Sequence, residues 1–192
     1  IFRILQESNV TGRLVIVGAG QAGFAVAAKL RSLKDMRPIT ILGAEDCLPY
    51  QRPPLSKKYL LGEMTFDRLL FRPESWFPEN EVEIRLSTPV EEIAREEKVV
   101  RLFDGSVIPY ETLVLATGAT PRRLPAAIGG DFEGVYTVRD RKDADLMAGE
   151  MKEGRRLLII GGGYIGLEAA AVARKLGVEV TLIEMADRIL QR

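Results

Sequence analysis

Apolar and polar residues alternate along this 192-residue chain in blocks that are typical of strands and helices. A short apolar run, Leu14–Val17, predicts a buried strand, and the Ala-rich segment after it predicts a helix that reaches about Leu30. A second apolar run, Ile39–Leu42, predicts another buried strand. Residues 13–45 are therefore expected to form a β-α-β unit.

The same pattern returns near the end of the sequence. Leu157–Ile160 predicts a strand, an Ala-rich helix is expected to run to about Lys175, and Val178–Ile183 predicts the next strand. Gly177 is the expected helix cap, because glycine tolerates the left-handed conformation there. The chain thus contains an internal repeat of one β-α-β unit.

Weaker patterns fill the region between the two repeats. Trp76 and Phe77 are expected to pack at the end of a short helix rather than to form a binding platform. Asp104-Gly105 is expected to be a hairpin turn. The further elements expected are short helices over 57–62 and 67–78, a strand over 81–86, a hairpin of 91–101 with 102–108, a buried strand over 112–116 and a helix over 140–152.

A glycine motif joins strand to helix in both repeats. The first reads Gly18-Ala19-Gly20-Gln21-Ala22-Gly23, and each of its glycines has an expected task. Gly18 allows the tight turn, Gly20 lets a pyrophosphate approach the backbone, and Gly23 lets the helix pack closely on the strand. Free helix amides then face the phosphates. The alternative interpretation is a buried β-α-β unit without a ligand.

In the second repeat, the corresponding glycines are Gly161, Gly163 and Gly166. An acidic residue follows the second strand of each unit, where a carboxylate can accept hydrogen bonds from a ribose. Glu45 lies 22 residues after Gly23, and Glu184 lies 18 residues after Gly166. Two sites predict two bound dinucleotides.

The composition of the chain excludes several classes of partner and of catalytic site. Lys plus Arg and Asp plus Glu both number 27, so no basic excess indicates a nucleic acid or an anionic membrane as partner. The chain has no histidine, which excludes Ser-His-Asp and Cys-His catalysis within these residues, and no metal site is expected. Its single cysteine, Cys47, excludes a disulfide framework and favours a reducing, cytoplasmic compartment. No apolar run is long enough to span a membrane.

The loop after Glu45 carries a more specific signal. Residues 49–57 read PYQRPPLSK and residues 116–125 read ATGATPRRLP. Both segments resemble the ferredoxin reductases of oxygenase systems, and the resemblance runs from about Arg13 to Arg192. It implies an α/β, glutathione-reductase-like fold with two Rossmann-like lobes and a three-stranded β-meander. We expect an extension over 1–12, an FAD-binding lobe over 13–120 and an incomplete NAD-binding lobe over 121–192. The chain is expected to be the N-terminal part of a longer protein.

In that family FAD occupies the first unit and NADH the second. The resemblance implies that Gly18, Gly20 and Gly23 bind the FAD pyrophosphate and that Glu45 binds the adenosine ribose. Other positions are implied as well: Arg52 near the phosphates, Lys57 against the flavin, Val90 at the adenine, and Ala116, Thr117 and Gly118 where the lobe closes. Ordinary alternatives stay open, namely a surface arginine for Arg52, a solvated lysine for Lys57 and a strand residue for Val90.

The second site follows the same logic. Gly161, Gly163 and Gly166 would bind the NAD pyrophosphate, and the carboxylate of Glu184 favours NADH over NADPH because it would repel a 2′-phosphate. Arg188, four residues further on, softens that preference. The resemblance places Tyr164 between flavin and nicotinamide and pairs Glu168 with Lys57 across the lobe interface. The alternatives are a packed turn aromatic for Tyr164 and a helix-start charge for Glu168.

The resemblance therefore implies a reductase that passes a hydride from NADH to FAD and then single electrons to a [2Fe–2S] ferredoxin serving an oxygenase. Two other readings stay open. One is a single-cysteine NADH oxidase or coenzyme A-disulfide reductase, although Cys47 lies only two residues after Glu45 and should stay near the adenosine ribose. The other is a scaffold that binds NADH, like the related apoptosis-inducing factor. The fragment alone is expected to bind FAD poorly and to be inactive.

Overall fold

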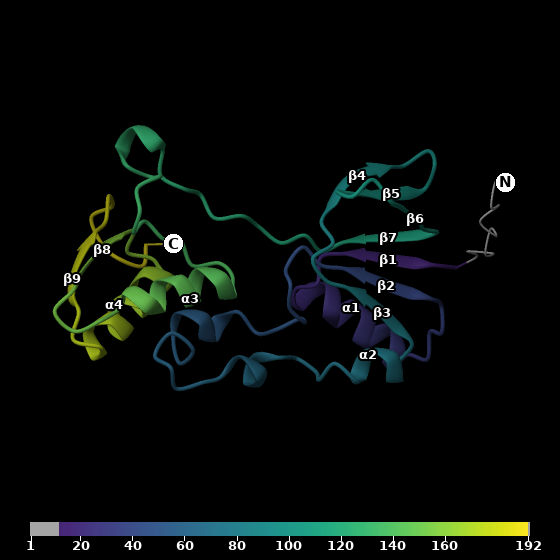
Figure 1. Ribbon diagram of the computed structural model, residues 1–192, viewed down its shortest axis with the longest axis horizontal. Coiled ribbons are helices and arrows are strands. Elements are labelled where there is room, and N and C mark those ends of the chain that lie inside the picture. Colours follow the sequence, from purple (N-terminus) through teal and green to yellow (C-terminus); the bar gives the residue numbers. More distant parts are fainter. Residues whose placement is uncertain (1–11, 192) are drawn as a thin grey trace. The chain divides into compact units, whose positions relative to one another are not determined.

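The computed structural model describes residues 12–191, which form two compact units. Residues 12–50 and 70–119 make up the first unit, and residues 51–69 and 120–191 make up the second. The extension expected over 1–12 lies outside the described residues except for Gly12. The segment 51–69 thus belongs to the second unit, although its position in the sequence lies within the first (Figure 1).

A four-stranded parallel sheet forms the centre of the first unit, in the order β3-β2-β1-β7. Its strands are β1 (Leu14–Val17), β2 (Ile39–Leu42), β3 (Val82–Arg85) and β7 (Thr112–Leu115). The predicted strands are confirmed, and every residue of β1 and β2 is buried. The prediction that β7 is buried was wrong, since Leu115 is 60% exposed.

One side of this sheet is covered by α1 (Gln21–Ser32) and the short α2 (Trp76–Glu79). Phe24 stacks on Phe71 with ring centroids 5.4 Å apart, and Trp76 meets Phe24 edge-on at 5.2 Å. The predicted packing role of Trp76 and Phe77 is therefore confirmed. The predicted helix over 67–78 was wrong: α2 begins at Trp76, because Pro73 disfavours helical backbone in the residue before it.

The other side of the sheet meets a three-stranded antiparallel meander (Figure 1). It consists of β4 (Val90–Ala94), β5 (Val99–Leu102) and β6 (Val107–Pro109). The turn at Asp104-Gly105 is confirmed, with positive φ at Gly105 but not at Asp104. The single arm expected over 91–101 instead folds into two strands, because four consecutive charged residues break the apolar pattern and Lys98 turns with φ 52°.

In the second unit, a two-stranded parallel sheet of β8 (Arg156–Ile160) and β9 (Glu179–Ile183) lies against α3 (Arg141–Glu150) and α4 (Tyr164–Lys175). These predicted elements are confirmed. Asp140 caps α3 by accepting a hydrogen bond from the amide of Asp143. Gly177 ends α4 with φ 77°, as predicted, and the amide of Val178 closes the cap on the carbonyl of Ala173.

The segment 51–69 is anchored in this second unit by buried side chains. It contains two 3₁₀ turns, η1 (Pro53–Ser56) and η2 (Phe66–Leu69). Leu60 is 3% exposed and packs in one cluster with Met147 and Val178. The helix predicted over 57–62 was wrong: Lys57 leaves helical geometry at φ −128° and ψ −115°, so the residues after it form only turns.

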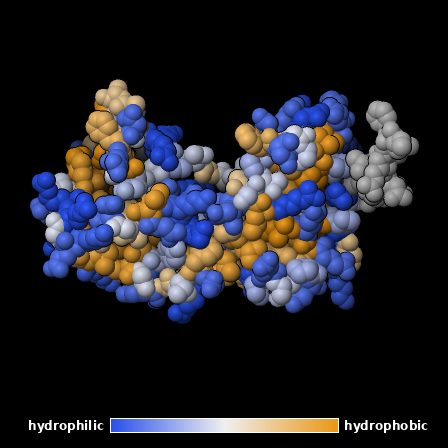
Figure 2. Space-filling view, in the orientation of Figure 1, coloured by the Kyte–Doolittle hydropathy of each residue, from blue (hydrophilic) through white to orange (hydrophobic). Residues whose placement is uncertain are grey.

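The outer face of the β8–β9 sheet carries exposed apolar side chains. Leu158, Ile160 and Ile183 are each more than half exposed. Figure 2 shows hydrophobic residues between hydrophilic ones in the region of β8 and β9.

A short 3₁₀ turn, η3 (Ala126–Ile128), lies earlier in the same unit. None of the helices within residues 12–191 has the length and apolar character that crossing a membrane requires.

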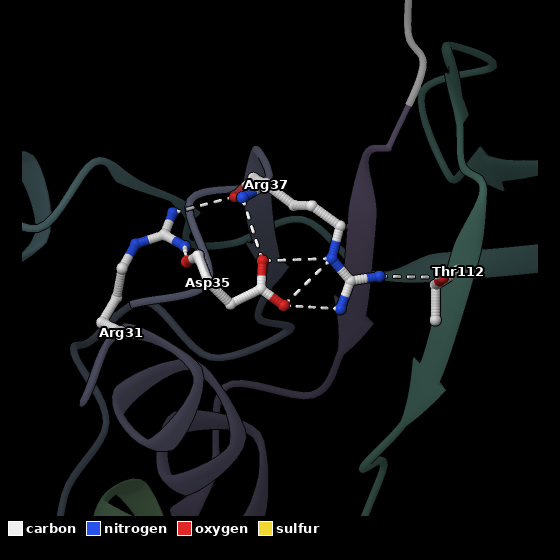
Figure 3. A network of polar contacts seen from close by, with 4 residues as sticks. All are labelled: Arg31, Asp35, Arg37 and Thr112. Carbon is white, nitrogen blue, oxygen red and sulfur yellow. Dashed lines mark hydrogen bonds and ion pairs between the residues drawn. The ribbon is translucent and has the colours of Figure 1, made fainter. Parts of the chain in front are cut away.

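Arginines fasten the sheet of the first unit at the amino ends of its strands (Figure 3). Arg31, in the last turn of α1, donates hydrogen bonds to the backbone carbonyls of Asp35 at 2.5 Å and Arg37 at 3.1 Å. The guanidinium of Arg37 pairs with the Asp35 carboxylate at 2.8 Å and also reaches the hydroxyl of Thr112 on β7. The hydrogen bonds from Arg37 lower the pKa of Asp35 from 3.8 to about 2.

This ion pair predicts a specific acid sensitivity. Because the pKa of Asp35 is about 2 when folded and 3.8 otherwise, the pair stabilises the protein above pH 3.8, and this stabilisation is lost as the pH falls toward 2. An Arg37→Met variant should raise the pKa of Asp35 in an NMR titration. Lys34→Met, which removes a neighbouring charge without this contact, should leave that pKa unchanged. An unchanged pKa in Arg37→Met would contradict the assignment.

Candidate dinucleotide-binding sites

The first glycine turn is built on contacts between backbone atoms. The amide of Gly18 donates to the carbonyl of Leu42 at 2.8 Å, and its φ of 114° suits glycine. A Cβ atom at Gly18 would lie 2.1 Å from the carbonyl oxygen of Ala116, and one at Gly23 would lie 2.0 Å from the carbonyl oxygen of Gly18. Both positions therefore require glycine for the turn and the helix packing, as predicted.

Gly20 requires a different explanation. It is the N-cap of α1 with an ordinary φ of −85°, and a Cβ atom there would meet no protein atom within 4 Å. Neither backbone conformation nor packing calls for glycine. No side chain caps this helix, and its first turn carries no acidic residue. A group that approaches the backbone closely and carries negative charge fits this position, since helix amides and the dipole favour an anion.

The second turn repeats this geometry. The amide of Gly161 donates to the carbonyl of Ile183 at 2.8 Å, with φ 111°. A Cβ atom at Gly166 would lie 2.3 Å from the carbonyl oxygen of Gly161. Gly163 is the N-cap of α4 with φ −78°, and nothing lies within 4 Å of a Cβ atom placed there. The residues of both turns thus fit a bound pyrophosphate on the same grounds.

The two acidic residues are not in equivalent positions. The hydrogen bonds from Gly18 and Gly161 make Leu42 and Ile183 the corresponding strand ends. Glu184 follows its strand end directly, whereas Glu45 lies three residues beyond Leu42. Each carboxylate is held by its own partners. Glu45 Oε2 accepts a hydrogen bond from the hydroxyl of Tyr50 at 2.7 Å.

Glu184 is held against its glycine turn. One carboxylate oxygen accepts from the amide of Gly162 at 2.6 Å, and the other accepts from the amide of Ala186 at 2.8 Å. A Cβ atom at Gly162 would lie 3.1 Å from the Glu184 carboxylate and 2.7 Å from the side chain of Ile189. The middle glycine of this turn therefore leaves room for the acid that we expect to meet the ribose.

The chain returns to the first turn through the ATG segment. Ala116 donates to the carbonyl of Val17 at 2.8 Å, so its own carbonyl lies against Gly18. Thr117 and Gly118 follow directly and are exposed, and Gly118 has φ 74°. Val90 begins β4 at a bulge, pairs with Leu102 and packs on the core of the first unit. The structure thus gives Val90 a strand role and does not test its predicted adenine contact.

The predicted Lys57–Glu168 contact is present. Lys57 Nζ lies 3.0 Å from Glu168 Oε1, and both residues belong to the second unit. The helix-start explanation for Glu168 was wrong, because α4 begins at Tyr164 and Glu168 lies beyond its first turn. The packed explanation for Tyr164 was also wrong, since its side chain is 67% exposed among the described residues. Arg52 donates to the carbonyl of Arg139 at 2.8 Å and is half-buried.

Three hydrogen-bond donors to the acidic site residues were not predicted from the sequence. The Tyr50 hydroxyl donates to Glu45, and the amide of Gly162 donates to Glu184. The Ser56 hydroxyl donates to Oε2 of Glu168 at 2.6 Å, the carboxylate oxygen that does not pair with Lys57. Tyr50 and Ser56 lie inside the PYQRPPLSK segment, so the signal for them was present. Their hydrogen-bond partners depend on tertiary structure and could not be taken from spacing.

The fold defines the class: an α/β protein with two Rossmann-type units, each with a glycine turn between a parallel strand and a helix. The chain belongs to the pyridine nucleotide-disulphide oxidoreductase family, whose model matches residues 12–192. It is 46% identical to a ferredoxin–NAD(P)+ reductase of Sphingomonas. The matched region covers 93% of this chain and 43% of the relative.

Two further relatives agree. The ferredoxin–NAD+ reductase component of the anthranilate 1,2-dioxygenase system of Burkholderia cepacia is 44% identical over 93% of this chain and 44% of its own length. The solved covalent complex of putidaredoxin reductase with putidaredoxin matches with TM-score 0.91 and 39% identity, over 96% of this chain and 45% of that chain. The predicted resemblance to ferredoxin reductases is confirmed. The chain spans less than half the length of these relatives.

The contrast between the glycines predicts separable effects. Gly20→Ala and Gly163→Ala should change the free energy of unfolding by no more than about 1 kcal/mol, because the backbone and the surroundings tolerate a methyl group. Each should nevertheless weaken dinucleotide binding at its own turn by about tenfold or more, which is about 1.4 kcal/mol. Denaturant unfolding and titration with the dinucleotide measure the two effects.

Gly23→Ala is the matched comparison. Its added methyl group would meet the Gly18 carbonyl, so it should destabilise the protein by about 2 kcal/mol or more. Normal dinucleotide affinity in Gly20→Ala would show that this open glycine has no ligand to accommodate.

Proposed function

We propose that the full-length protein is a flavoprotein reductase that takes a hydride from NADH and passes single electrons to a [2Fe–2S] ferredoxin serving an oxygenase, in the cytoplasm. The observation that carries the proposal is the pair of open glycine turns in one chain, at Gly20 and Gly163, which no packing or backbone requirement explains. The relatives named as ferredoxin reductases supply the direction of the chemistry.

FAD is assigned to the first unit. Gly18, Gly20 and Gly23 present the amides of α1 to its pyrophosphate, and Glu45 accepts hydrogen bonds from the adenosine ribose. The Tyr50 hydroxyl donates a hydrogen bond to Oε2 of Glu45 and so orients this carboxylate. Ala116, Thr117 and Gly118 border the turn because they follow β7, the neighbour of β1. Arg52 and Val90 are further proposed contacts, to the phosphates and the adenine.

NADH is assigned to the second unit. The turn of Gly161, Gly163 and Gly166 binds its pyrophosphate at the start of α4, where no acidic residue occupies the first turn. The carboxylate of Glu184 accepts the ribose hydroxyls and repels a 2′-phosphate, which favours NADH over NADPH. Tyr164 is exposed at the start of α4, where it would shield the flavin and move aside for the nicotinamide.

Bound FAD supplies the conversion of a two-electron donor into single electrons. The chain supplies position and charge. Lys57 holds a positive charge near the flavin, where it stabilises negative charge that develops on the ring, and Glu168 holds Lys57 in place. No side chain needs to act as a general acid or base, which agrees with the absence of histidine from the sequence.

The test uses the full-length protein. It should contain flavin absorbance that NADH bleaches under anaerobic conditions, and the colour should return when an oxidised [2Fe–2S] ferredoxin is added. A protein without flavin would overturn the proposal. Slow NADH oxidation with a long-lived charge-transfer band and no acceleration by any ferredoxin would favour an NADH-binding scaffold instead.

The Glu184→Gln variant tests the proposed preference for NADH over NADPH. Removing the charge should weaken NADH binding by about tenfold, since a hydrogen bond to a charged group contributes about 1.5–3 kcal/mol, and should narrow the gap to NADPH. Glu179→Gln is the control, because Glu179 is exposed at the other end of β9. Equal NADH and NADPH affinities in the unmodified protein would contradict the role of Glu184.

A further inference from the structure

Ser56 is a buried polar side chain with a defined partner. Only 5% of it is exposed, and among residues 12–191 it shares the description of buried polar residue with Thr40 alone. It ends the 3₁₀ turn η1 and directly precedes Lys57. Its burial is not explained by the conformation of the turn, since the turn is closed by backbone hydrogen bonds from Leu55 to Arg52 and from Lys57 to Pro54.

One carboxylate joins the side chains of these two consecutive residues. Ser56 Oγ donates to Glu168 Oε2 at 2.6 Å, and Lys57 Nζ lies 3.0 Å from Glu168 Oε1. Each oxygen of Glu168 therefore has its own donor. Burial raises the pKa of Glu168, and the hydrogen bonds from Ser56 and Lys57 lower it more, so the net effect is a lowered pKa and an ionised carboxylate at neutral pH.

The two contacts differ in how firmly they are held. The Lys57 side chain is 50% exposed and that of Glu168 is 28% exposed. An ion pair in that environment contributes little and does not by itself fix two long side chains. The hydroxyl of Ser56 is short, buried and set on a turn that contains Pro53 and Pro54. It is therefore the fixed point from which the carboxylate is oriented.

We propose that Ser56 is a positioning residue: its hydroxyl orients Glu168 so that the second carboxylate oxygen fixes the ammonium group of Lys57. Glu168 lies on α4, the helix that begins at the second glycine turn, so Lys57 is held in register with the helix that binds the nicotinamide nucleotide. The consequence for electron transfer rests on the proposed function, in which Lys57 acts on the flavin.

The first test measures the contact without using activity. In full-length protein with ¹³C-labelled glutamate, assigned by loss of the signal in Glu168→Gln, the Ser56→Ala variant should raise the pKa of Glu168. Ser56→Thr keeps the hydroxyl, so the pKa of Glu168 should stay at its value in the unmodified protein. Ser106→Ala is the matched control, because Ser106 also donates from its hydroxyl to a carboxylate, Asp104, at 2.7 Å in the first unit. It should leave Glu168 unchanged.

The second test measures the consequence in the holoenzyme. Ser56→Ala should slow flavin reduction at saturating NADH by about three- to tenfold while the KM for NADH stays unchanged, because the interaction lost acts on the reacting ring rather than on NADH binding. The double variant Ser56→Ala/Glu168→Gln should be no slower than Glu168→Gln alone, since Ser56 acts through Glu168. Ser56→Cys, nearly isosteric and a weak donor, serves if the alanine variant fails to fold.

The outcomes separate the two claims. A protein without flavin would overturn the proposed function, while the pKa of Glu168 in Ser56→Ala would still test the contact. If flavin is present and reduced by NADH, an unchanged pKa of Glu168 in Ser56→Ala overturns the positioning role. Multiplicative losses of rate in the double variant would overturn it too, because they would show that Ser56 acts independently of Glu168.

Discussion

The close approach of a helix to the strand before it governs both binding units. At Gly23 and at Gly166, a side chain would lie within 2.3 Å of a carbonyl oxygen of the preceding turn, so only glycine allows the helix to start where it does. No side chain caps the first amides of α1 or α4 at that start. The open glycines, Gly20 and Gly163, lie at this position, and an anion is the group that uncapped helix amides favour.

The two units are repeats in their turns but not in what surrounds them. Glu184 follows its strand directly and is bound by the amide of its own turn, whereas Glu45 lies further along and is held by Tyr50. The segment 51–69 departs further from the repeat, since it lies between the two parts of the first unit in sequence and packs in the second unit. Lys57 is thereby tied to α4 through Glu168, and its charge is positioned by the unit to which we assign NADH.

Strong periodic patterns made most of the fold predictable. The strands β1, β2, β8 and β9 and the helices α1 and α4 consist of apolar runs or Ala-rich segments bounded by glycine, so local preference and tertiary packing agree. Prediction failed where the two diverge. Residues 57–62 have the composition of a helix, but the backbone of Lys57 is not helical. Leu60 is buried in the core of the second unit, so tertiary packing and local preference disagree here.

The site was predictable only as far as its glycines, acids and the Lys57–Glu168 pair. Glycine spacing reports backbone geometry, which is local, and the pair followed from the resemblance. The donors that orient the acids, Tyr50 and Ser56, find their partners through the fold, and Ser56 lies 112 residues from Glu168. No pattern within one segment encodes such a contact.

Amide hydrogen exchange in the full-length flavoprotein tests the central claim most directly, because it reads both turns in one experiment. With FAD bound throughout, addition of NAD+ should protect the amides of residues 161–168 and leave those of residues 18–24 unchanged. Removal of FAD should then expose residues 18–24. Protection of the first turn by NAD+, or exposure of the second turn alone on removal of FAD, would contradict the assignment of the two dinucleotides.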